Sequence, residues 1–368
     1  MNNITVKIAA LLWATSGAFA NPAPKIEEAH KQISDQAYTR IDSMVVYQHG
    51  QLVSEHYYGR FKKDTLHRTH SSFKSITGLL ALIAIDQKLL SADENIRPLL
   101  ALLESSKNKD PRQANITISN LLDMTSGLDC DEAPGSNGPS HEWGVDEGPT
   151  PLKYSLDISM KQEPGSEWHY CSANSFMLAA TVSAALKRAG GPDIFTFAHQ
   201  NLFAPLDITN YRLTRSQSGE YLNGQGNSYF TPGDLAKVGL LVLNKGNWHG
   251  KQIISSQAIN RLYKANSIIN WSWTDTIPEH RETTSRYSSQ WYQTDFDVEG
   301  SKIPVLHSWG NGGQFIFVVP SLDTVAVFTG SNQGSSRIVQ QKQPFDIMYR
   351  YILPEMKSRL ANRAAINQ

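Results

Sequence analysis

The segments of this 368-residue chain that have the pattern of β-strands lie at its two ends, while those between them have helical periodicity. Near the N-terminus, two such segments flank His49-Gly50, which predicts a β-hairpin with glycine supplying the positive φ of the turn. The predicted strands cover residues 44–47, 52–58, 303–306, 314–319 and 324–328. We therefore expect an α/β (α+β) fold, in which an antiparallel sheet built from both termini is flanked by helices and carries an inserted helical lobe.

The helical segments set the expected domain organisation. Apolar residues recur at three- and four-residue spacing over residues 73–88, as in an amphipathic helix. Helices are also predicted over residues 25–36, 99–103, 118–124, 175–187, 232–243 and 345–356. We expect residues 21–95 and 285–368 to form an α/β lobe and residues 96–284 a helical lobe, with the active site at the seam. The polar, Gly/Pro-rich stretch 131–151 is predicted to be a long unstructured connection with a functional or mobile role.

The first twenty residues have the pattern of a secretory signal peptide. Lys7 precedes the apolar stretch 8–13, and Ala18-Phe19-Ala20 matches the small-x-small pattern of a cleavage site. We expect residues 1–20 to be removed before Asn21, so that the mature chain is periplasmic or secreted. The alternative is a buried N-terminal helix of a cytoplasmic protein.

The charge balance excludes some classes of partner. The chain has 34 Lys+Arg and 34 Asp+Glu, a formal net charge of +0, and no basic block. Clustered basic residues supply much of the affinity of proteins for nucleic acids and anionic membranes. We therefore expect no nucleic-acid partner, and no apolar run reaches the ~20 residues that span a bilayer.

Two cysteines, Cys130 and Cys171, complete the expectations that follow from export. An even number of cysteines in an oxidising compartment favours a disulfide. Such a bridge would close a loop worth about 4 kcal/mol in the chain-entropy description. Two buried free thiols remain the alternative, because spacing does not show whether the two Cα atoms are within reach.

The chemistry centres on Ser71-Ser72-Phe73-Lys74, at the first turn of the predicted helix 73–88. Residues i and i+3 share one face of a helix, so Lys74 can reach the Ser71 oxygen. A serine needs a base to become a nucleophile, and a lysine acts as that base when burial or nearby positive potential lowers its pKa. The N-terminal end of the helix dipole acts in that direction. His67 and His70 form an H-x-x-H pattern just before Ser71, for which we expect a structural role rather than a metal site.

Two further segments follow in an informative order. Tyr170 and Ser172 lie in 164–174 (PGSEWHYCSAN), and 309–313 (WGNGG) precedes a predicted strand. This order of S-x-x-K, Y-x-S and a Gly-bearing triad resembles the serine β-lactamase and penicillin-binding-protein superfamily. The resemblance is greatest to the branch with class C β-lactamases, family VIII esterases and 6-aminohexanoate-oligomer hydrolases. The segments 116–128 (ITISNLLDMTSGL) and 231–239 (TPGDLAKVG) are similar to two other segments of that branch.

The resemblance implies roles for particular residues. Ser71 would be the acylated nucleophile, Lys74 its base partner, and Tyr170 the group that passes a proton to the leaving group. Ser172 would donate to the substrate or to Lys74. If Asn311-Gly312-Gly313 is the third motif, the backbone N–H groups of Ser71 and Gln314 would form the oxyanion hole. The fold would be β-lactamase/transpeptidase-like, and neither a metal nor a cofactor is expected.

One departure bears on the substrate. Asn311 stands where penicillin-recognising relatives have a cation that holds the substrate carboxylate. We therefore expect a small or short-oligomer substrate with a neutral amide or ester bond, although His307 would be a substitute cation. Trp309 and Tyr292 are candidates for the pocket wall. A β-lactamase or D-Ala-D-Ala carboxypeptidase and a non-catalytic penicillin-binding-like sensor remain alternatives, and the sequence leaves the oligomeric state open.

Overall fold

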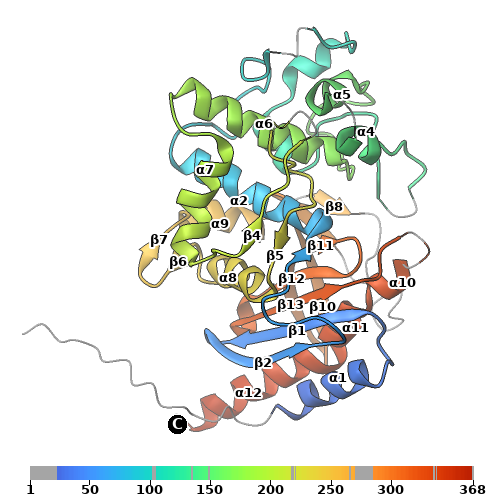
Figure 1. The fold of residues 1–368 in the computed structure, drawn as a ribbon, viewed down its shortest axis with the longest axis vertical. Helices are drawn as coiled ribbons and strands as arrows, with labels where there is room; N and C mark the ends of the chain where they lie inside the picture. The colour runs from blue at the N-terminus through green and yellow to red at the C-terminus, as the bar shows by residue number, and fades with distance from the viewer. Residues whose placement is uncertain are drawn as a thin grey trace, which may run out of the picture.

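The fold is built around one large antiparallel sheet (Figure 1). The computed structural model of the chain describes residues 23–101, 105–133, 136–147, 150–216, 219, 221–264, 267–269, 285–334, 336 and 338–366. The strand order is β2 (Gln51–Tyr57), β1 (Ile41–Gln48), β13 (Thr324–Gly330), β12 (Gln314–Val319), β11 (Ser301–Gly310), β10 (Trp291–Val298), β9 (Ser285–Ser288) and β8 (Ser267–Ile269). The N-terminal hairpin thus pairs with the last strand, which confirms the prediction of a sheet made from both ends.

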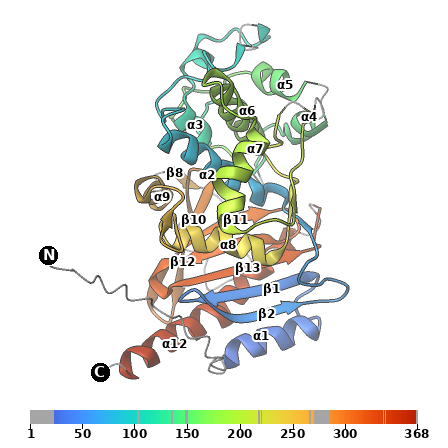
Figure 2. The same cartoon turned by 60° about the vertical axis from the view of Figure 1, so that its left-hand side comes forward.

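Alternating apolar side chains give the sheet two buried faces. On β12, Phe315 and Phe317 belong to one hydrophobic cluster, whereas Ile316 and Val318 belong to the other. The first face is covered by α1 (Pro24–Ser34), α11 (Gln343–Ile347) and α12 (Leu353–Ile366), and the second by α8 (Pro232–Leu243). Figure 2 shows α1 and α12 on the side of the sheet opposite α8. A period of two along the strands therefore yields a layered α/β core.

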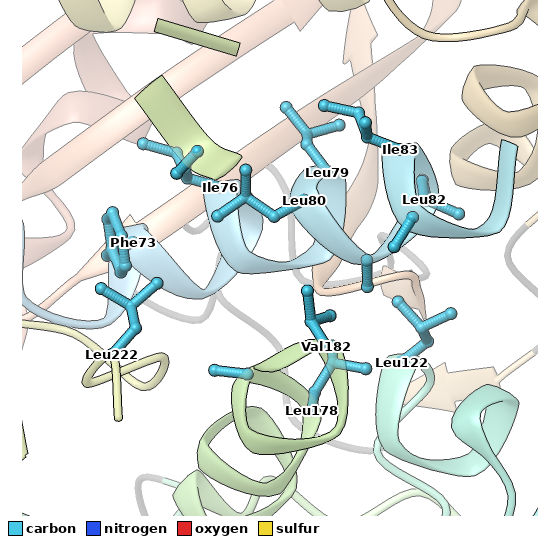
Figure 3. Close-up of a cluster of buried hydrophobic side chains, with 14 of the residues drawn as sticks. Phe73, Ile76, Leu79, Leu80, Leu82, Ile83, Leu122, Leu178, Val182 and Leu222 are labelled. Carbon is cyan, nitrogen blue, oxygen red and sulfur yellow. The ribbon is translucent and has the colours of Figure 1, made fainter. Parts of the chain in front are cut away.

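Helix α2 (Phe73–Asp86) lies between the sheet and the helical region (Figures 1 and 2). It is apolar nearly all round, as expected for a helix covered on several sides. Figure 3 shows its side chains meeting Leu122 of α3 (Ile118–Leu122) and Leu178 and Val182 of α6 (Ser172–Arg188). The predicted helix 73–88 is confirmed as α2, which is packed between the sheet and the helices.

The remaining elements complete the helical region and its edges. They are α4 (Glu142–Glu147), α5 (Pro151–Asp157), α7 (Ile194–Ala198), α9 (Ser256–Tyr263) and α10 (Ile338–Gln341), with the short strands β3 (His67–Arg68), β4 (Tyr211–Arg212), β5 (Tyr229–Phe230), β6 (Asn247–Trp248) and β7 (Lys251–Gln252). The stretch 131–151, predicted to be unstructured, contains α4, which packs against α5 and α6.

Some predictions fall outside what the structure describes. Residues 1–20, expected to be a signal peptide, lie outside the described residues, as does part of the predicted helix 99–103. Within the described chain, no helix has the length and apolar character needed to cross a bilayer. The division into lobes at residues 96 and 284 stays a prediction. Two elements between those positions belong with the large sheet: helix α8 packs against it, and strand β8 is its last strand.

Candidate active site

Ser71 lies in a single turn of 3-10 helix, His70–Ser72, which leads directly into α2. His70 has a left-handed backbone with φ of 47°, a conformation that costs a non-glycine residue about 1–3 kcal/mol. Two glycines pack on this turn. A Cβ on Gly226 would lie 2.9 Å from the His70 carbonyl oxygen, and one on Gly310 would overlap the Thr69 carbonyl. The backbone at these two glycines thus packs directly against the turn that carries Ser71.

Lys74 meets Ser71 as the motif spacing predicted. Lys74 Nζ donates to Ser71 Oγ over 2.9 Å and to the Gln225 carbonyl over 2.9 Å. The lysine is 3% exposed, whereas Ser71 is half-buried. Lys74 Nζ also lies 5.0 Å from the ring centroid of Tyr170. The structure therefore brings the three predicted catalytic residues, Ser71, Lys74 and Tyr170, into one cluster.

The charge environment of Lys74 differs from the expectation. Burial lowers the pKa of Lys74, but Tyr170 and the carboxylates of Glu132 and Glu142 outweigh it, so the net pKa is raised. The expectation that Lys74 has the lowered pKa of a general base is wrong, because negative groups gather around its head. Lys74 is consequently an ammonium ion that donates to the Ser71 hydroxyl oxygen.

The sequence analysis missed Glu132, which is central to this cluster. Its Oε2 accepts from the backbone N–H of Ser172 over 3.1 Å and from the Ser172 hydroxyl over 2.6 Å, and its Oε1 accepts from the N–H of His141 over 3.2 Å. Burial raises the pKa of Glu132, with Lys74 acting in the opposite direction. Ser172, expected to donate to the substrate or to Lys74, instead donates a hydrogen bond from its hydroxyl to Glu132.

A disulfide joins the segments that carry Glu132 and Tyr170. Cys130 and Cys171 are bonded, with their Cα atoms 5.5 Å apart, and the backbone N–H of Glu132 donates to the Tyr170 carbonyl over 2.7 Å. Cys130, Glu132 and Cys171 are also the one His/Cys/Asp/Glu group, among the described residues, that is compact enough to share a metal ion. Its two sulfur atoms are bonded to each other in this structure.

The end of β11 forms another wall of the cluster. Strand β10 pairs with β11 only as far as His307, so residues 308–310 extend past β10. Ser308 Oγ is 2.6 Å from Ser72 Oγ, next to the nucleophile. The predicted motif residues Asn311, Gly312 and Gly313 form the turn into β12, where Gly312 pairs with Asn332. Gln314 lies opposite Gly310 in the hairpin, and its side-chain Nε2 donates to the Gly330 carbonyl. The expected oxyanion role belongs to its backbone N–H and stays a prediction.

The profile of the β-lactamase family matches residues 6–344, which is most of the chain and includes Ser71, Lys74 and Tyr170. The chain belongs to the β-lactamase family. The resemblance seen in the sequence is thereby confirmed, and this β-lactamase-family protein is a serine hydrolase by class. Over 179 residues it is 27% identical to "Acyltransferase mokF" of Monascus pilosus, covering 43% of this chain and 40% of that protein's length.

Solved structures share the fold of this β-lactamase-family protein. A protein of Bacillus anthracis described as a candidate 6-aminohexanoate-dimer hydrolase superposes with a TM-score of 0.66 at 18% identity, over 86% of this chain and 80% of that one. EstCE1, described as a hydrolase with promiscuous acyltransferase activity, superposes with a TM-score of 0.63 at 19% identity, over 88% of this chain and 98% of that one.

The histidine considered as a substitute cation is unsuited to that role in this family member. His307 is fully buried, burial lowers its pKa to about 3, and its Nε2 is 3.0 Å from Thr294 Oγ1. It is therefore neutral at physiological pH. Tyr292 stacks on it and, like Trp309, is buried, so both aromatic residues pack in the core beside the site. His67 is also buried, 3.7 Å from Asp42, which agrees with the expected structural role.

Proposed function

We propose that this protein is an exported serine hydrolase that cleaves a neutral amide or ester bond through an acyl-enzyme on Ser71. The observation that carries the proposal is the 2.9 Å hydrogen bond from Lys74 Nζ to Ser71 Oγ at the start of a buried helix, beside Tyr170. Burying an ammonium group lowers the stability of a protein unless polar or charged partners compensate for the lost water. Here one of these partners is the half-buried Ser71. Export rests on the pattern of residues 1–20 and on the disulfide.

The proposed acylation step uses Lys74 and Tyr170 as a coupled pair. In the active state the pair has given up one proton, so the Lys74 ammonium stands beside a Tyr170 phenolate. The Tyr170 oxygen takes the proton of Ser71 as Oγ bonds to the substrate's carbonyl carbon. Collapse of the tetrahedral intermediate breaks the bond to the leaving group, which receives that proton from Tyr170. The backbone N–H of Ser71 and a backbone N–H of the hairpin between β11 and β12 would hold the oxyanion.

Deacylation repeats the same steps with water as nucleophile. A water molecule gives a proton to Tyr170 and its oxygen bonds to the acyl carbon. The ester bond to Ser71 then breaks, and Ser71 Oγ recovers a proton from Tyr170. The product acid leaves, and the pair returns to its starting protonation state.

The wall beside Ser71 favours a neutral acyl group. Ser308 and Gly310 are the β11 residues that meet the nucleophile's turn, and neither is charged. Asn311 is exposed and its side-chain oxygen accepts from Gly334, while His307 is neutral. A carboxylate-bearing β-lactam or peptidoglycan stem therefore lacks the charged partner that its recognition commonly uses.

A substrate panel tests the proposal. Purified protein and Ser71→Ala are compared on p-nitrophenyl acetate and butyrate, on an acyl p-nitroanilide and on nitrocefin. We expect Ser71-dependent turnover of an ester or the anilide, with far slower turnover of nitrocefin. Efficient nitrocefin hydrolysis would favour the β-lactamase alternative. Binding of benzylpenicillin without turnover of any member of the panel would favour a sensor.

Acyl transfer to an alcohol is a second candidate activity. It is favoured by two similar proteins, one described as an acyltransferase and the other as a hydrolase with promiscuous acyltransferase activity. The chemistry requires only that an alcohol replace water in the second step. Adding an alcohol such as butanol to the ester assay would then raise the rate of p-nitrophenol release and give a new ester, detected by mass spectrometry.

A further inference from the structure

Glu132 is a half-buried carboxylate beside the proposed catalytic pair, and the proposed mechanism does not use it. The protein holds it in one position: the N–H and hydroxyl of Ser172 bind Oε2, and the N–H of His141 binds Oε1. The backbone N–H of Glu132 donates to the carbonyl of Tyr170, and the neighbouring Cys130 is bonded to Cys171. The carboxylate is thus fixed by the same segment that carries Tyr170.

The partners of this carboxylate leave its charge available to Lys74. The three donors that bind it are neutral, and hydrogen bonds from neutral donors stabilise a carboxylate without cancelling its charge. Charges in a buried site interact far more strongly than in water. The charge of Lys74 acts to lower the pKa of Glu132, and the charge of Glu132 in turn acts to raise the pKa of Lys74.

We propose that Glu132 is a positioning residue of the active site, whose negative charge sets the pH at which the Lys74–Tyr170 pair releases its proton. This inference rests on the proposed function of that pair. The arrangement also gives Ser172 a role: its hydroxyl orients the carboxylate instead of contacting the substrate. A nearby negative charge favours the protonated forms of both Lys74 and Tyr170. Glu132 therefore makes the Lys74–Tyr170 pair a stronger base, and the pair releases its proton at a higher pH than it would without Glu132.

Other titratable groups also face the cluster, and their contributions define the controls. Facing Lys74, Tyr170 or Glu132 from neighbouring elements are Glu142 on α4, Tyr287 on β9 and Tyr292 on β10, with His141, His169 and Asp131 in the adjoining loops. Glu142 is exposed, so its effect on Lys74 is screened by solvent. Glu167 is also exposed, with its Oε2 3.3 Å from His169 Nε2, so its charge is screened by solvent and its removal is a matched control.

The test follows the rate of phosphonylation of Ser71 by a fluorophosphonate probe across pH 5 to 10, in Glu132→Gln, Glu132→Asp, Glu167→Gln and wild type. Glutamine keeps the size and an acceptor oxygen but removes the charge. We expect the acidic limb of the Glu132→Gln profile to lie roughly one pH unit below that of wild type. Glu132→Asp, which keeps the charge, and Glu167→Gln should keep the wild-type limb.

The outcomes separate this inference from the proposed function. A Glu132→Gln profile that is lower at every pH but has an unmoved acidic limb would overturn the inference and show a structural role. If Glu132→Gln fails to fold, Glu132→Asp decides: a limb at the wild-type pH supports the inference, and a displaced limb contradicts it. Wild-type protein that is not labelled at all would instead contradict the proposed function.

Discussion

Lys74 donates to Ser71 Oγ from a position where its own ammonium is almost fully buried, and the second acceptor on the same nitrogen is the carbonyl of Gln225. The Ser71 hydroxyl, the proposed nucleophile, therefore accepts from a cation that is also held by a second acceptor. Around that cation lie Tyr170 and the carboxylates of Glu132 and Glu142, which together keep it charged. The predictions below follow from this relationship and from the packing that supports it.

Replacing Lys74 with methionine should abolish most activity without unfolding the protein. Methionine has a similar length and suits a buried site, but the substitution takes a cation away from Glu132 and a donor away from the Gln225 carbonyl, so some unfolding free energy is lost while the fold is kept. We expect kcat/KM for an ester substrate to fall by about 10²- to 10⁴-fold, the usual contribution of proton-transfer groups. Thermal unfolding would show the fold retained. Lys74→Arg keeps the positive charge but replaces the compact ammonium with a planar guanidinium. Activity close to wild type in that variant would contradict the role of the lysine.

Removal of the disulfide should weaken both the fold and the site. In Cys130→Ser/Cys171→Ser the loop of separation 41 is open in the unfolded chain, which costs about 2–5 kcal/mol of unfolding free energy. Activity should fall further than stability explains, because Glu132 and Tyr170 flank the bridge. Denaturant unfolding and ester turnover, each with and without dithiothreitol, measure the effect. In the wild type, dithiothreitol should lower stability and turnover to the values of the double variant, whereas the double variant itself should not respond to dithiothreitol. Unaltered stability and turnover of the wild type after verified reduction would contradict this prediction.

Gly310→Ala should disrupt the nucleophile's turn. A Cβ at this position would overlap the Thr69 carbonyl oxygen and lie 3.0 Å from the Ser72 nitrogen, both backbone atoms that cannot rotate away. Overpacking of this kind costs about 1–3 kcal/mol, and the shift falls on the residues flanking Ser71. The matched control is Gly233→Ala, in helix α8, where no atom lies within 4 Å of the new Cβ. We expect stability and turnover to fall in the first variant only; equal behaviour of the two variants would be the contrary result.

His307 should make the protein less stable in acid. Burial lowers its pKa from 6.5 to about 3, so between these values the unfolded chain binds a proton that the folded chain does not. The unfolding free energy therefore falls as the pH drops from 6.5 toward 3, by up to about 1.4 kcal/mol per pH unit. His307→Asn removes the group that binds this proton. Urea unfolding at pH 6.5 and 4.5 should therefore show a smaller loss of unfolding free energy in the variant than in wild type. The same loss in both proteins would refute the assignment.

Strong local periodicity explains which elements the sequence predicted well. Strand β12 and helix α8 have apolar patterns bounded by turn residues, and the structure has them at the predicted bounds. The hairpin at His49-Gly50 is also found, although its first strand begins three residues before the predicted start. By contrast, β9 and β10 were not predicted. Residues 285–288 are Ser-Arg-Tyr-Ser, and their strand conformation depends on pairing with β8 and β10 rather than on their own propensity. The alternation of Tyr292, Thr294, Phe296 and Val298 on β10 was the available signal.

The site divides in the same way. Ser71, Lys74 and Tyr170 follow from motif order, because the spacing of a helix turn alone brings Lys74 to Ser71. Glu132 has no such local signal, since its position depends on a loop closed by the disulfide and by the N–H groups of distant residues. The raised pKa of Lys74 was missed for the same reason: the helix dipole is a local effect, whereas the opposing carboxylates arrive through tertiary packing.

Covalent labelling tests the central claim most directly. Wild type and Ser71→Ala are incubated with a fluorophosphonate, the intact masses are measured, and the labelled protein is digested and sequenced by tandem mass spectrometry. We predict one phosphonyl group per wild-type chain, located on Ser71, and none on Ser71→Ala. Labelling at another serine, or equal labelling of the two proteins, would contradict the account.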